Sequence, residues 1–439
     1  MSLQPPETVR KFQQTLHEKA KANPTYRFYA LYDKLYRADI LKHAWKCCRR
    51  NGGKPGVDGI SFEQIERRGV ELWLDEVAGE LREKRYVPEA VRRVMIPKPN
   101  GKQQPLGIPT IKDRVVQMAA VIILSPIFEA DLCEEQYAYR EGKSAHGAIR
   151  ETHHWISRGH HEVLDADLSG YFDTIPHPEL IKSLARRISD GAMLKVLKMW
   201  LKMPVEETGP KGGKRRMNPA KRTRRGTPQG APISPLLSNL YMRRFILGWK
   251  RLGWERKLGA RIVNYADDFV ILCKGRGTEA AAAMRTIMER LKLTVNEEKT
   301  TVCTLPEGRF EFLGYEIGRC YSAKTGKSFW GTRPSRKSIR SITGQISMLT
   351  RSNRVLIETE AVVEAINRKM VGWGNYFSLG PVSSAYRTVD QHARHRVRRW
   401  LCRKHKMPGK GTRRFTDQHL GEHLGLVCLQ SRPRGHAYA

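Results

Sequence analysis

Two adjacent carboxylates, Asp267 and Asp268, lie between two apolar runs of this chain. The run before them reads Arg-Ile-Val-Asn-Tyr (261–265), and the run after them reads Phe-Val-Ile-Leu-Cys (269–273). β-Branched and aromatic residues of this kind are typical of strands, so the segment predicts a tight β-hairpin with buried strands. Two anions at a buried turn are costly unless cations neutralise them. The hairpin therefore predicts Mg²⁺ at this turn, and a solvated acidic loop is the alternative.

The chain has 439 residues, 40% of them apolar, and a formal net charge of +35. This length suits two or three domains, and the apolar content is enough to bury them. Such an excess of Lys and Arg is typical of a protein that binds nucleic acid. A basic membrane-surface protein is the rival interpretation, but the sequence has no run of 18 apolar residues and its N-terminal residues lack the apolar core of a signal peptide. We expect no membrane partner and a location in the bacterial cytosol beside the nucleoid.

The eight cysteines are scattered and form no Cys-x2-Cys pair, so we expect reduced structural thiols. Cys402 and His405 offer two ligands at helical spacing, but no second pair accompanies them. A zinc site needs about four such ligands, so the sequence favours no zinc site.

A second acidic segment, residues 162–173, reads Glu-Val-Leu-Asp-Ala-Asp-Leu-Ser-Gly-Tyr-Phe-Asp. Strand alternation puts Asp165 and Asp167 on the same face. Asp167 lies where the strand ends, so its carboxylate can project into a cleft with Asp267, as two-metal catalysis requires of separate segments. We expect Asp165 to be a satisfied or neighbouring anion, and Asp173 to cap the following helix.

A loop rich in Gly and Pro, residues 225–241, lies between the two acidic segments and opens into an apolar helix. Glycines let a backbone approach a ligand closely, and Gln229 and Ser234 can form hydrogen bonds to a nucleotide or template strand. A plain junction between a loop and a helix is the alternative. Residues 206–225, just before it, hold eight Lys or Arg and two Glu, which suits phosphate contact as well as a solvated loop.

The C-terminal part, residues 331–439, has 21 Lys or Arg and 6 Asp or Glu. Apolar residues at helical spacing predict two packed helices there. We expect the opposite face of the second helix to lie along a nucleic-acid backbone. That face carries Arg394, Arg396, Arg398, Arg399 and Arg403.

The three central segments, in this order and separation, resemble motifs A, B and C of reverse transcriptases. They read Asp-Leu-Ser-Gly-Tyr-Phe-Asp, Gly-Thr-Pro-Gln-Gly-Ala-Pro-Ile-Ser-Pro-Leu-Leu and Tyr-Ala-Asp-Asp. The likeness is to group II intron reverse transcriptase/maturases of the type that lacks an endonuclease domain. It extends to an early fingers block at 51–59, a fingers hairpin at 96–109, motif D at 293–300, a primer grip at 310–315 and a thumb at 372–377.

The resemblance implies an α+β fold: a right-hand polymerase whose fingers and palm, with an antiparallel palm sheet, precede an α-helical thumb or X domain. We expect an N-terminal helical extension and early fingers over residues 1–60, and fingers and palm over 61–320. The helical thumb would then span 321–405. A short basic tail without an endonuclease domain would follow over 406–439.

The resemblance also assigns metal ligands. Asp167 and Asp267 would bind two Mg²⁺ ions with help from the Leu168 carbonyl, and Asp268 would complete the catalytic acids. Phe172 would lie under the incoming sugar and exclude a 2′-hydroxyl, with a core aromatic as the alternative.

The remaining roles concern phosphate and nucleic acid. Lys98 and Lys102 in the fingers hairpin, together with Gln229, would bind nucleotide. Lys299 of motif D would protonate leaving pyrophosphate, although Lys98 and Lys299 also fit solvated surface lysines. The expected nucleic-acid contacts are Arg215, Arg216, Arg222, Arg225, Gly314, Arg394 and Arg398.

One position departs from the family pattern. Where the family usually has Arg before Pro-Leu-Gly-Ile-Pro, this chain has Gln104. Arg offers a bidentate, permanently charged grip on phosphate that Gln lacks. We therefore predict a raised nucleotide requirement unless Lys102 substitutes.

The resemblance implies an RNA-directed DNA polymerase that copies an RNA template from a DNA primer with dNTPs. It would also bind structured RNA, specifically group II intron RNA, and assist splicing and retrohoming. Two alternatives stay open: an RNA-binding maturase with secondary polymerase activity, and a free-standing host reverse transcriptase used in DNA repair or phage defence. The sequence leaves the oligomeric state open.

Overall fold

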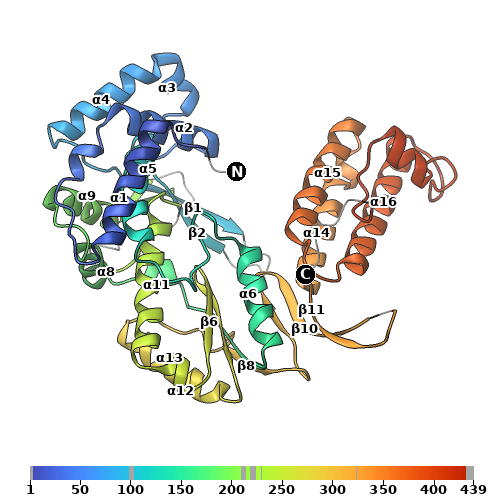
Figure 1. The fold of residues 1–439 in the computed structure, drawn as a ribbon. Helices are drawn as coiled ribbons and strands as arrows, with labels where there is room; N and C mark the ends of the chain where they lie inside the picture. Colours follow the sequence, from blue (N-terminus) through green and yellow to red (C-terminus); the bar gives the residue numbers. More distant parts are fainter. Residues whose placement is uncertain are drawn as a thin grey trace.

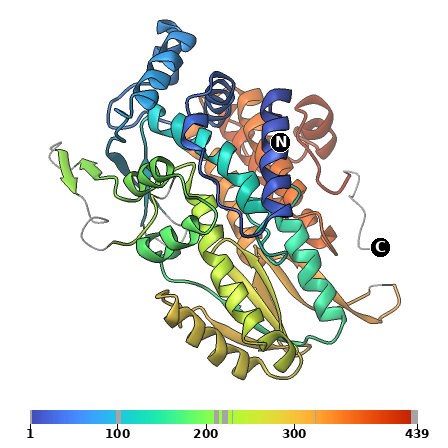
Figure 2. The same ribbon diagram turned by 60° about the vertical axis from the view of Figure 1, so that its left-hand side comes forward.

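The computed structural model describes residues 3–97, 103–208, 214–217, 224–228, 230–322 and 324–431. Figure 1 shows three parts: blue N-terminal helices, a green-to-yellow centre built on a sheet, and orange-to-red C-terminal helices beyond β10 and β11. Figure 2 shows the helix-lined strands of the centre from another side. The α+β fold with an antiparallel central sheet is confirmed.

The N-terminal part is a helical layer around α5. Its elements are α1 (Glu7–Ala22), η1 (Tyr32–Lys34), α2 (Ala38–Asn51), α3 (Phe62–Arg68), α4 (Val70–Arg82) and α5 (Ile111–Glu129). α5 is buried on nearly all sides, and α1 and α2 pack against it. The hydroxyl of Thr110 accepts a hydrogen bond from the backbone N–H of Asp113 and so caps the start of α5.

A small sheet extends from this layer. Its strands, in the order β2-β1-β4-β5, are β1 (Val91–Pro97), β2 (Gln103–Ile108), β4 (Val205–Thr208) and β5 (Lys214–Met217). β1 and β2 are antiparallel, with Pro97 opposite Gln103, so the expected hairpin is present. Lys98 and Lys102 at its tip lie outside the described residues.

The central sheet has the order β6-β7-β3-β8 and is antiparallel throughout. Its strands are β3 (Glu162–Ala166), β6 (Arg261–Tyr265), β7 (Asp268–Cys273) and β8 (Thr301–Thr304). Side chains alternate between two buried faces. Val163 and Val270 pack with α6 (Ala145–Ser157), whereas Leu164 and Ile271 belong to the main core on the other face.

Further helices cover and flank this sheet. They are α7 (Tyr171–Thr174), α8 (His177–Ala185), α9 (Gly191–Leu201), α11 (Ser234–Arg251), α12 (Trp254–Lys257) and α13 (Gly277–Arg290). α13 packs on β3 and β7, and α11 packs on α8 and α13. Pro176 occupies the N-cap position of α8, and no side chain forms a capping hydrogen bond there. The predicted capping role of Asp173 is therefore wrong.

The C-terminal part begins later than the sequence indicated. β9 (Phe310–Phe312), β10 (Tyr315–Tyr321) and β11 (Ser328–Pro334) form a three-stranded sheet, so a boundary at residue 321 would cut a hairpin. The helical elements that follow are α14 (Arg336–Leu349), η2 (Ser352–Arg354), α15 (Thr359–Tyr376), α16 (Ser383–Lys404) and η3 (His419–His423). Their core includes Leu420 and Leu429. Much of the segment expected as a tail is therefore packed onto the helices.

No helix in the described ranges is both long and apolar enough to cross a membrane.

Candidate active site

The predicted β-hairpin is present, with a two-residue turn of Ala266 and Asp267 closed by the pair of Tyr265 and Asp268. Ala266 has a φ of 59°, in the left-handed region that favours glycine. The side-chain amide of Asn264 donates a hydrogen bond of 2.8 Å to the Ala266 carbonyl. This buried asparagine therefore helps to hold the turn in a strained conformation.

The strands of the hairpin are buried, but its carboxylates are not. Asp267 is half-buried and Asp268 is exposed to solvent. The expectation of two anions at a buried turn is therefore only partly right: the strands fix the turn, and solvent reaches the acids. This accessibility suits groups that must meet an incoming ligand.

Strand register brings the second acidic segment to this turn. β3 pairs with β7 so that Asp165 lies opposite Val270 and Ala166 lies opposite Phe269. One step further, the same register places Asp167 opposite Asp268. The predicted convergence of Asp167 with the hairpin therefore follows from antiparallel pairing of two buried strands.

The carboxylate of Asp167 is held by residues of the loop before β8. Its Oδ2 accepts hydrogen bonds from the Asn296 amide at 3.0 Å and from Lys299 Nζ at 2.8 Å. Its backbone carbonyl accepts a bond of 2.8 Å from the Asn296 N–H. The next residue, Leu168, forms a bridge with Val295. The expected motif D segment thus fixes the first acid from both backbone and side chain.

Like charges crowd this site. Although solvent reaches Asp268, the protein packed around its carboxylate, followed by the charges of Asp267 and Asp167, raises its pKa to about 6. Burial, followed by the charges of Asp268 and Asp167, raises the pKa of Asp165 to about 7. Glu311 adds to the effect on Asp165. Each carboxylate makes its neighbours costlier to ionise, and a bound cation would remove that cost.

The donor chemistry of this cluster fits a hard divalent cation. Carboxylate and carbonyl oxygens are the ligands that Mg²⁺ prefers. As the side chains stand, no group of three or more His, Cys, Asp or Glu within the described ranges is arranged to hold a metal ion. Lys299 takes one oxygen of Asp167 in this arrangement. A metal would have to displace this ammonium group.

The Gly/Pro loop contacts both the site and the small sheet of β2, β1, β4 and β5, which we call the fingers sheet. Gly226 N–H donates to the Ile175 carbonyl, and Thr227 N–H donates to the Phe172 carbonyl. Gly230 has a φ of 96°, and a Cβ there would lie 2.7 Å from the carbonyl oxygen of Gly107 in β2. The glycine is needed because the loop and the hairpin touch backbone to backbone.

Other predictions about this loop, and about Phe172 of α7 beside it, have mixed outcomes. Gln229 lies outside the described residues. Ser234 is buried and its hydroxyl donates to the Pro228 carbonyl, so the prediction that it meets a ligand is wrong. Phe172 is half-buried, packs against the main core and lies 5.8 Å from the Tyr171 ring, between centroids. This position is compatible with both the sugar gate and the core aromatic.

The predicted nucleic-acid contacts are dispersed. Arg222 lies outside the described residues, and Arg215 and Arg216 are described only by their backbone in β5. Arg225 is exposed at a bridge with Pro176. Their predicted roles stay predictions.

Gly314 lies at a joint between the β9–β10 turn and α14. A Cβ there would be 3.0 Å from Ser338 Oγ and 3.2 Å from the Phe377 ring. The Gly314 carbonyl accepts hydrogen bonds from Ser335 N–H and Ser338 Oγ. A glycine is therefore needed at this position because a larger residue would crowd Ser338 and Phe377.

Arg394 and Arg398 of α16, two of the expected nucleic-acid contacts, both have partners within the protein, and their contact with nucleic acid stays a prediction. Arg398 donates to the Phe415 carbonyl and pairs with Asp417, and Arg394 also pairs with Asp417 at 3.3 Å. Burial lowers the pKa of Arg398. Both guanidinium groups fasten the C-terminal segment that folds back over the helix, while Arg399 and Arg403 of the same face are exposed.

Several residues around the site were not singled out from the sequence. Besides Asn264 and Asn296, they include Tyr139, which has a φ of 56° and whose pKa is raised by burial and by Asp267. The pKa of Tyr376 is raised to about 12 by burial, then by Tyr265 and Asp268. The only sequence signal was position: Asn296 lies within the expected motif D.

The fold and site define a class: a nucleotidyl-transferring palm, with an acid at the end of one strand and two acids at a neighbouring hairpin turn. Family comparison agrees. A model described as reverse transcriptase (RNA-dependent DNA polymerase) matches residues 96–317, just over half of the chain. A model described as the maturase-specific domain of group II introns matches residues 339–419. The chain belongs to the reverse transcriptase family and carries a group II intron maturase domain.

Two curated relatives extend this result. Protein YkfC of Escherichia coli (strain K12) is 32% identical over 350 residues, covering 71% of this chain and 88% of YkfC. The group II intron-encoded protein LtrA of Lactococcus lactis subsp. cremoris is 28% identical over 360 residues, covering 66% of this chain and 57% of LtrA. This chain thus spans just over half the length of LtrA.

A solved structure, a partial Cas6-RT-Cas1--Cas2 complex, matches 60% of this chain and 41% of its own, with 26% identity and a TM-score of 0.35.

Proposed function

We propose that this chain catalyses RNA-directed DNA synthesis, adding dNTPs to the 3′-hydroxyl of a DNA primer on an RNA template. The observation that supports this most strongly is the register of β3 with β7, which sets Asp167 against Asp267 and Asp268. These three carboxylates lie where the two central strands β3 and β7 meet the hairpin turn and are reached by solvent, which suits the two-metal form of nucleotidyl transfer.

In this proposal Asp167 and Asp267 hold two Mg²⁺ ions, with the Leu168 carbonyl and Asp268 completing the acidic set. When bound, the ions stabilise charge on the attacking and leaving oxygens. The chain's own part is orientation: Asn296 fixes Asp167, and Asn264 fixes the turn that carries Asp267.

Other residues would serve the nucleotide. Lys299 Nζ is within the acidic cluster and can give a proton to departing pyrophosphate. Phe172 would limit the room beneath the sugar. Lys98, Lys102 and Gln229 would bind phosphates.

We further propose that the chain binds structured group II intron RNA and assists splicing and retrohoming. The maturase-specific match over residues 339–419 favours intron RNA over a role in DNA repair or phage defence. A maturase in which RNA binding is the main work and polymerisation is secondary differs in one testable respect. Its essential function would survive the loss of the catalytic acids.

Primer extension on an RNA template with Mg²⁺ tests the polymerase proposal. We expect wild type to extend the primer, Asp267→Ala to lose extension and Asp75→Ala, at an exposed carboxylate of α4, to match wild type. Splicing assistance should persist in Asp267→Ala. No extension by wild type would overturn the proposal, and loss of both activities in Asp267→Ala would overturn their separation.

A further inference from the structure

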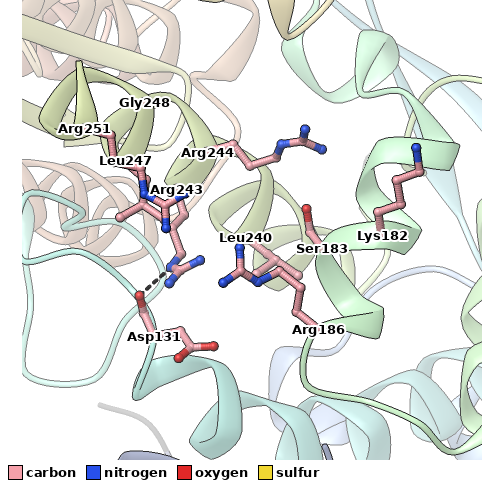
Figure 3. Close-up of a pocket in the computed structure, with 10 residues that line it drawn as sticks. All are labelled: Asp131, Lys182, Ser183, Arg186, Leu240, Arg243, Arg244, Leu247, Gly248 and Arg251. Atoms are coloured by element: carbon pink, nitrogen blue, oxygen red, sulfur yellow. Dashed lines mark hydrogen bonds between the residues drawn. The ribbon is translucent and has the colours of Figure 1, made fainter. Parts of the chain in front are cut away.

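A basic pocket of about 370 Å³ lies between α8, α11 and the residues just after α5 (Figure 3). We call it the α8–α11 pocket. Its lining consists of Asp131, Lys182, Ser183, Arg186, Leu240, Arg243, Arg244, Leu247, Gly248 and Arg251. Five of these ten residues are cationic and one is acidic.

The single acid in the lining is already neutralised. Asp131 accepts hydrogen bonds from Arg187 Nε at 2.8 Å and from Arg187 Nη2 at 2.6 Å. The Arg187 side chain of this bidentate pair is almost fully buried. Its guanidinium also donates hydrogen bonds to the carbonyls of Asn23 and Ala20. The five cations of the lining therefore remain in excess.

Two of these cations are held in place by the protein backbone. Arg243 Nε donates to the Asp131 carbonyl. Arg244 Nη1 donates to the Glu179 carbonyl at 3.0 Å, and its guanidinium lies 5.4 Å from the centroid of the Tyr241 ring. These contacts use carbonyls and a ring, so both side chains are oriented although neither guanidinium forms an ion pair with a carboxylate of the described residues.

The cationic groups come from α8, from the residue that follows it and from α11. In Figure 3 the guanidinium groups of Arg186 and Arg243 extend toward the same space, one from each side of the pocket. Burial lowers the pKa of Arg243; Asp131 and Cys133 oppose this shift, and the charge of Arg186 adds to it. Within the described part of the chain, Lys182, Arg186 and Arg251 have no ion pair. Holding these like charges close together costs free energy, and an anion bound between them would lower that cost.

The pocket is separate from the catalytic acids, none of which lines it. α11 begins at Ser234, beside the Gly/Pro loop. At a rise of 1.5 Å per residue, Arg243 to Arg251 lie about 13 to 26 Å farther along the helix axis. An anion here would therefore not be the reacting triphosphate.

We propose that the α8–α11 pocket binds a backbone phosphate of structured RNA and anchors that RNA outside the catalytic centre. This inference rests on the proposed RNA-binding function. Planar guanidinium groups suit the paired oxygens of a phosphodiester. α11 supplies three of them and Arg186, directly after α8, supplies the fourth, so one phosphate can be gripped from both sides.

The test compares two double variants in the full chain. Lys182→Gln/Arg186→Gln removes two exposed cations of the pocket that make no side-chain hydrogen bond or ion pair within the described residues. Lys195→Gln/Lys198→Gln removes two exposed cations of the neighbouring helix α9 that do not line the pocket. The first readout is the affinity for an in vitro transcribed, folded group II intron RNA over a range of salt concentrations. The second is extension of a short RNA–DNA template-primer.

We expect the pocket variant to bind the folded RNA about tenfold more weakly, with the salt slope reduced by about one for each phosphate that the variant no longer neutralises. The α9 variant should match wild type, and both should extend the short template-primer normally. Unchanged RNA affinity and slope in the pocket variant would overturn the proposal.

A second arm distinguishes a free anion from RNA. Inorganic tripolyphosphate is added while thermal unfolding is followed. If it stabilises wild type but not the pocket variant, and RNA affinity is the same for both, the pocket serves a free anion and the RNA assignment fails. If wild type binds RNA through the pocket but extends no primer, the polymerase proposal fails and the pocket proposal stands.

Discussion

Lys299 Nζ lies 2.8 Å from Oδ2 of Asp167, so an ammonium group lies within the acidic cluster. Its side chain is 64% exposed, which leaves it free to turn toward a substrate. We predict that Lys299→Met slows single-turnover nucleotide addition by about 100-fold, in the range of about 10² to 10⁴ that general acids contribute. Template-primer affinity should be unchanged, and rapid quench experiments at saturating Mg²⁺ measure the rate.

Lys292→Met is the matched control for this prediction. Lys292 forms a similarly short, exposed ion pair, at 2.6 Å with Glu179, and lies outside the acidic cluster. A wild-type rate for Lys299→Met, or an equal loss in Lys292→Met, would show that Lys299 is a surface lysine.

The contact between the Gly/Pro loop and the fingers sheet gives a second prediction. Gly230→Ala must move the loop away from Gly107, because its Cβ would be 2.7 Å from that carbonyl oxygen. Since the hairpin carries the expected triphosphate lysines, we predict a KM for dNTP raised several-fold. Gly159→Ala is the control, since it has a φ of 86° and no heavy atom within 4 Å of its Cβ. Equal kinetics in both variants would mean that this backbone approach has no role.

Gln104 gives a third prediction. Its backbone pairs with Ile96 in the fingers hairpin, while its side chain lies outside the described residues. Gln104→Arg would supply a bidentate, permanently charged phosphate ligand. We predict a lower KM for dNTP in steady-state primer extension with little change in kcat. An unchanged KM would refute the idea that Gln104 weakens triphosphate binding.

Asp113 gives a prediction about pH and stability. Burial raises the pKa of this fully buried carboxyl from 3.8 to about 6, although Tyr86, Thr110 and the Glu89 N–H donate hydrogen bonds to it. Because the folded-state pKa is above the ordinary one, folding is favoured while Asp113 is protonated. That contribution is lost as pH rises through about 6.

The check is urea unfolding of wild type and Asp113→Asn between pH 4 and 7.5. The asparagine cannot ionise, so the difference in unfolding free energy should shift in favour of the variant as pH rises. Parallel profiles for the two proteins would contradict the prediction.

The sequence predicted the core of the site because local rules determine it. The hairpin at Asp267 follows from two β-branched runs and a two-residue turn, and Asp167 follows from the end of a strand. The raised pKa of Asp165, a neighbouring anion, was not predicted. The shift comes first from burial, then from Asp268 and Asp167, and then from Glu311; burial and the approach of Asp268 and Glu311 depend on packing and on register with β7, which residues near 165 do not encode.

The C-terminal part shows a different limit. Helical periodicity correctly indicated which side of α16 is apolar. It gave no information about partners of the polar side, where Asp417 meets Arg394 and Arg398. Likewise, the β10–β11 hairpin extends beyond residue 321 through pairs such as Tyr321 with Ser328, which depend on a turn that residue composition alone did not reveal.

The central claim is that Asp167 and Asp267 form one metal-dependent catalytic centre. Its most direct test is single-nucleotide incorporation on an RNA template as Mg²⁺ is titrated from zero in wild type, Asp167→Asn and Asp267→Asn, with Asp75→Asn as control. We predict no product without metal, saturation with Mg²⁺ in wild type and in the control, and loss of incorporation in both other variants at every Mg²⁺ concentration. Incorporation without added metal in the presence of a chelator, or at the wild-type rate in either variant, would contradict the account.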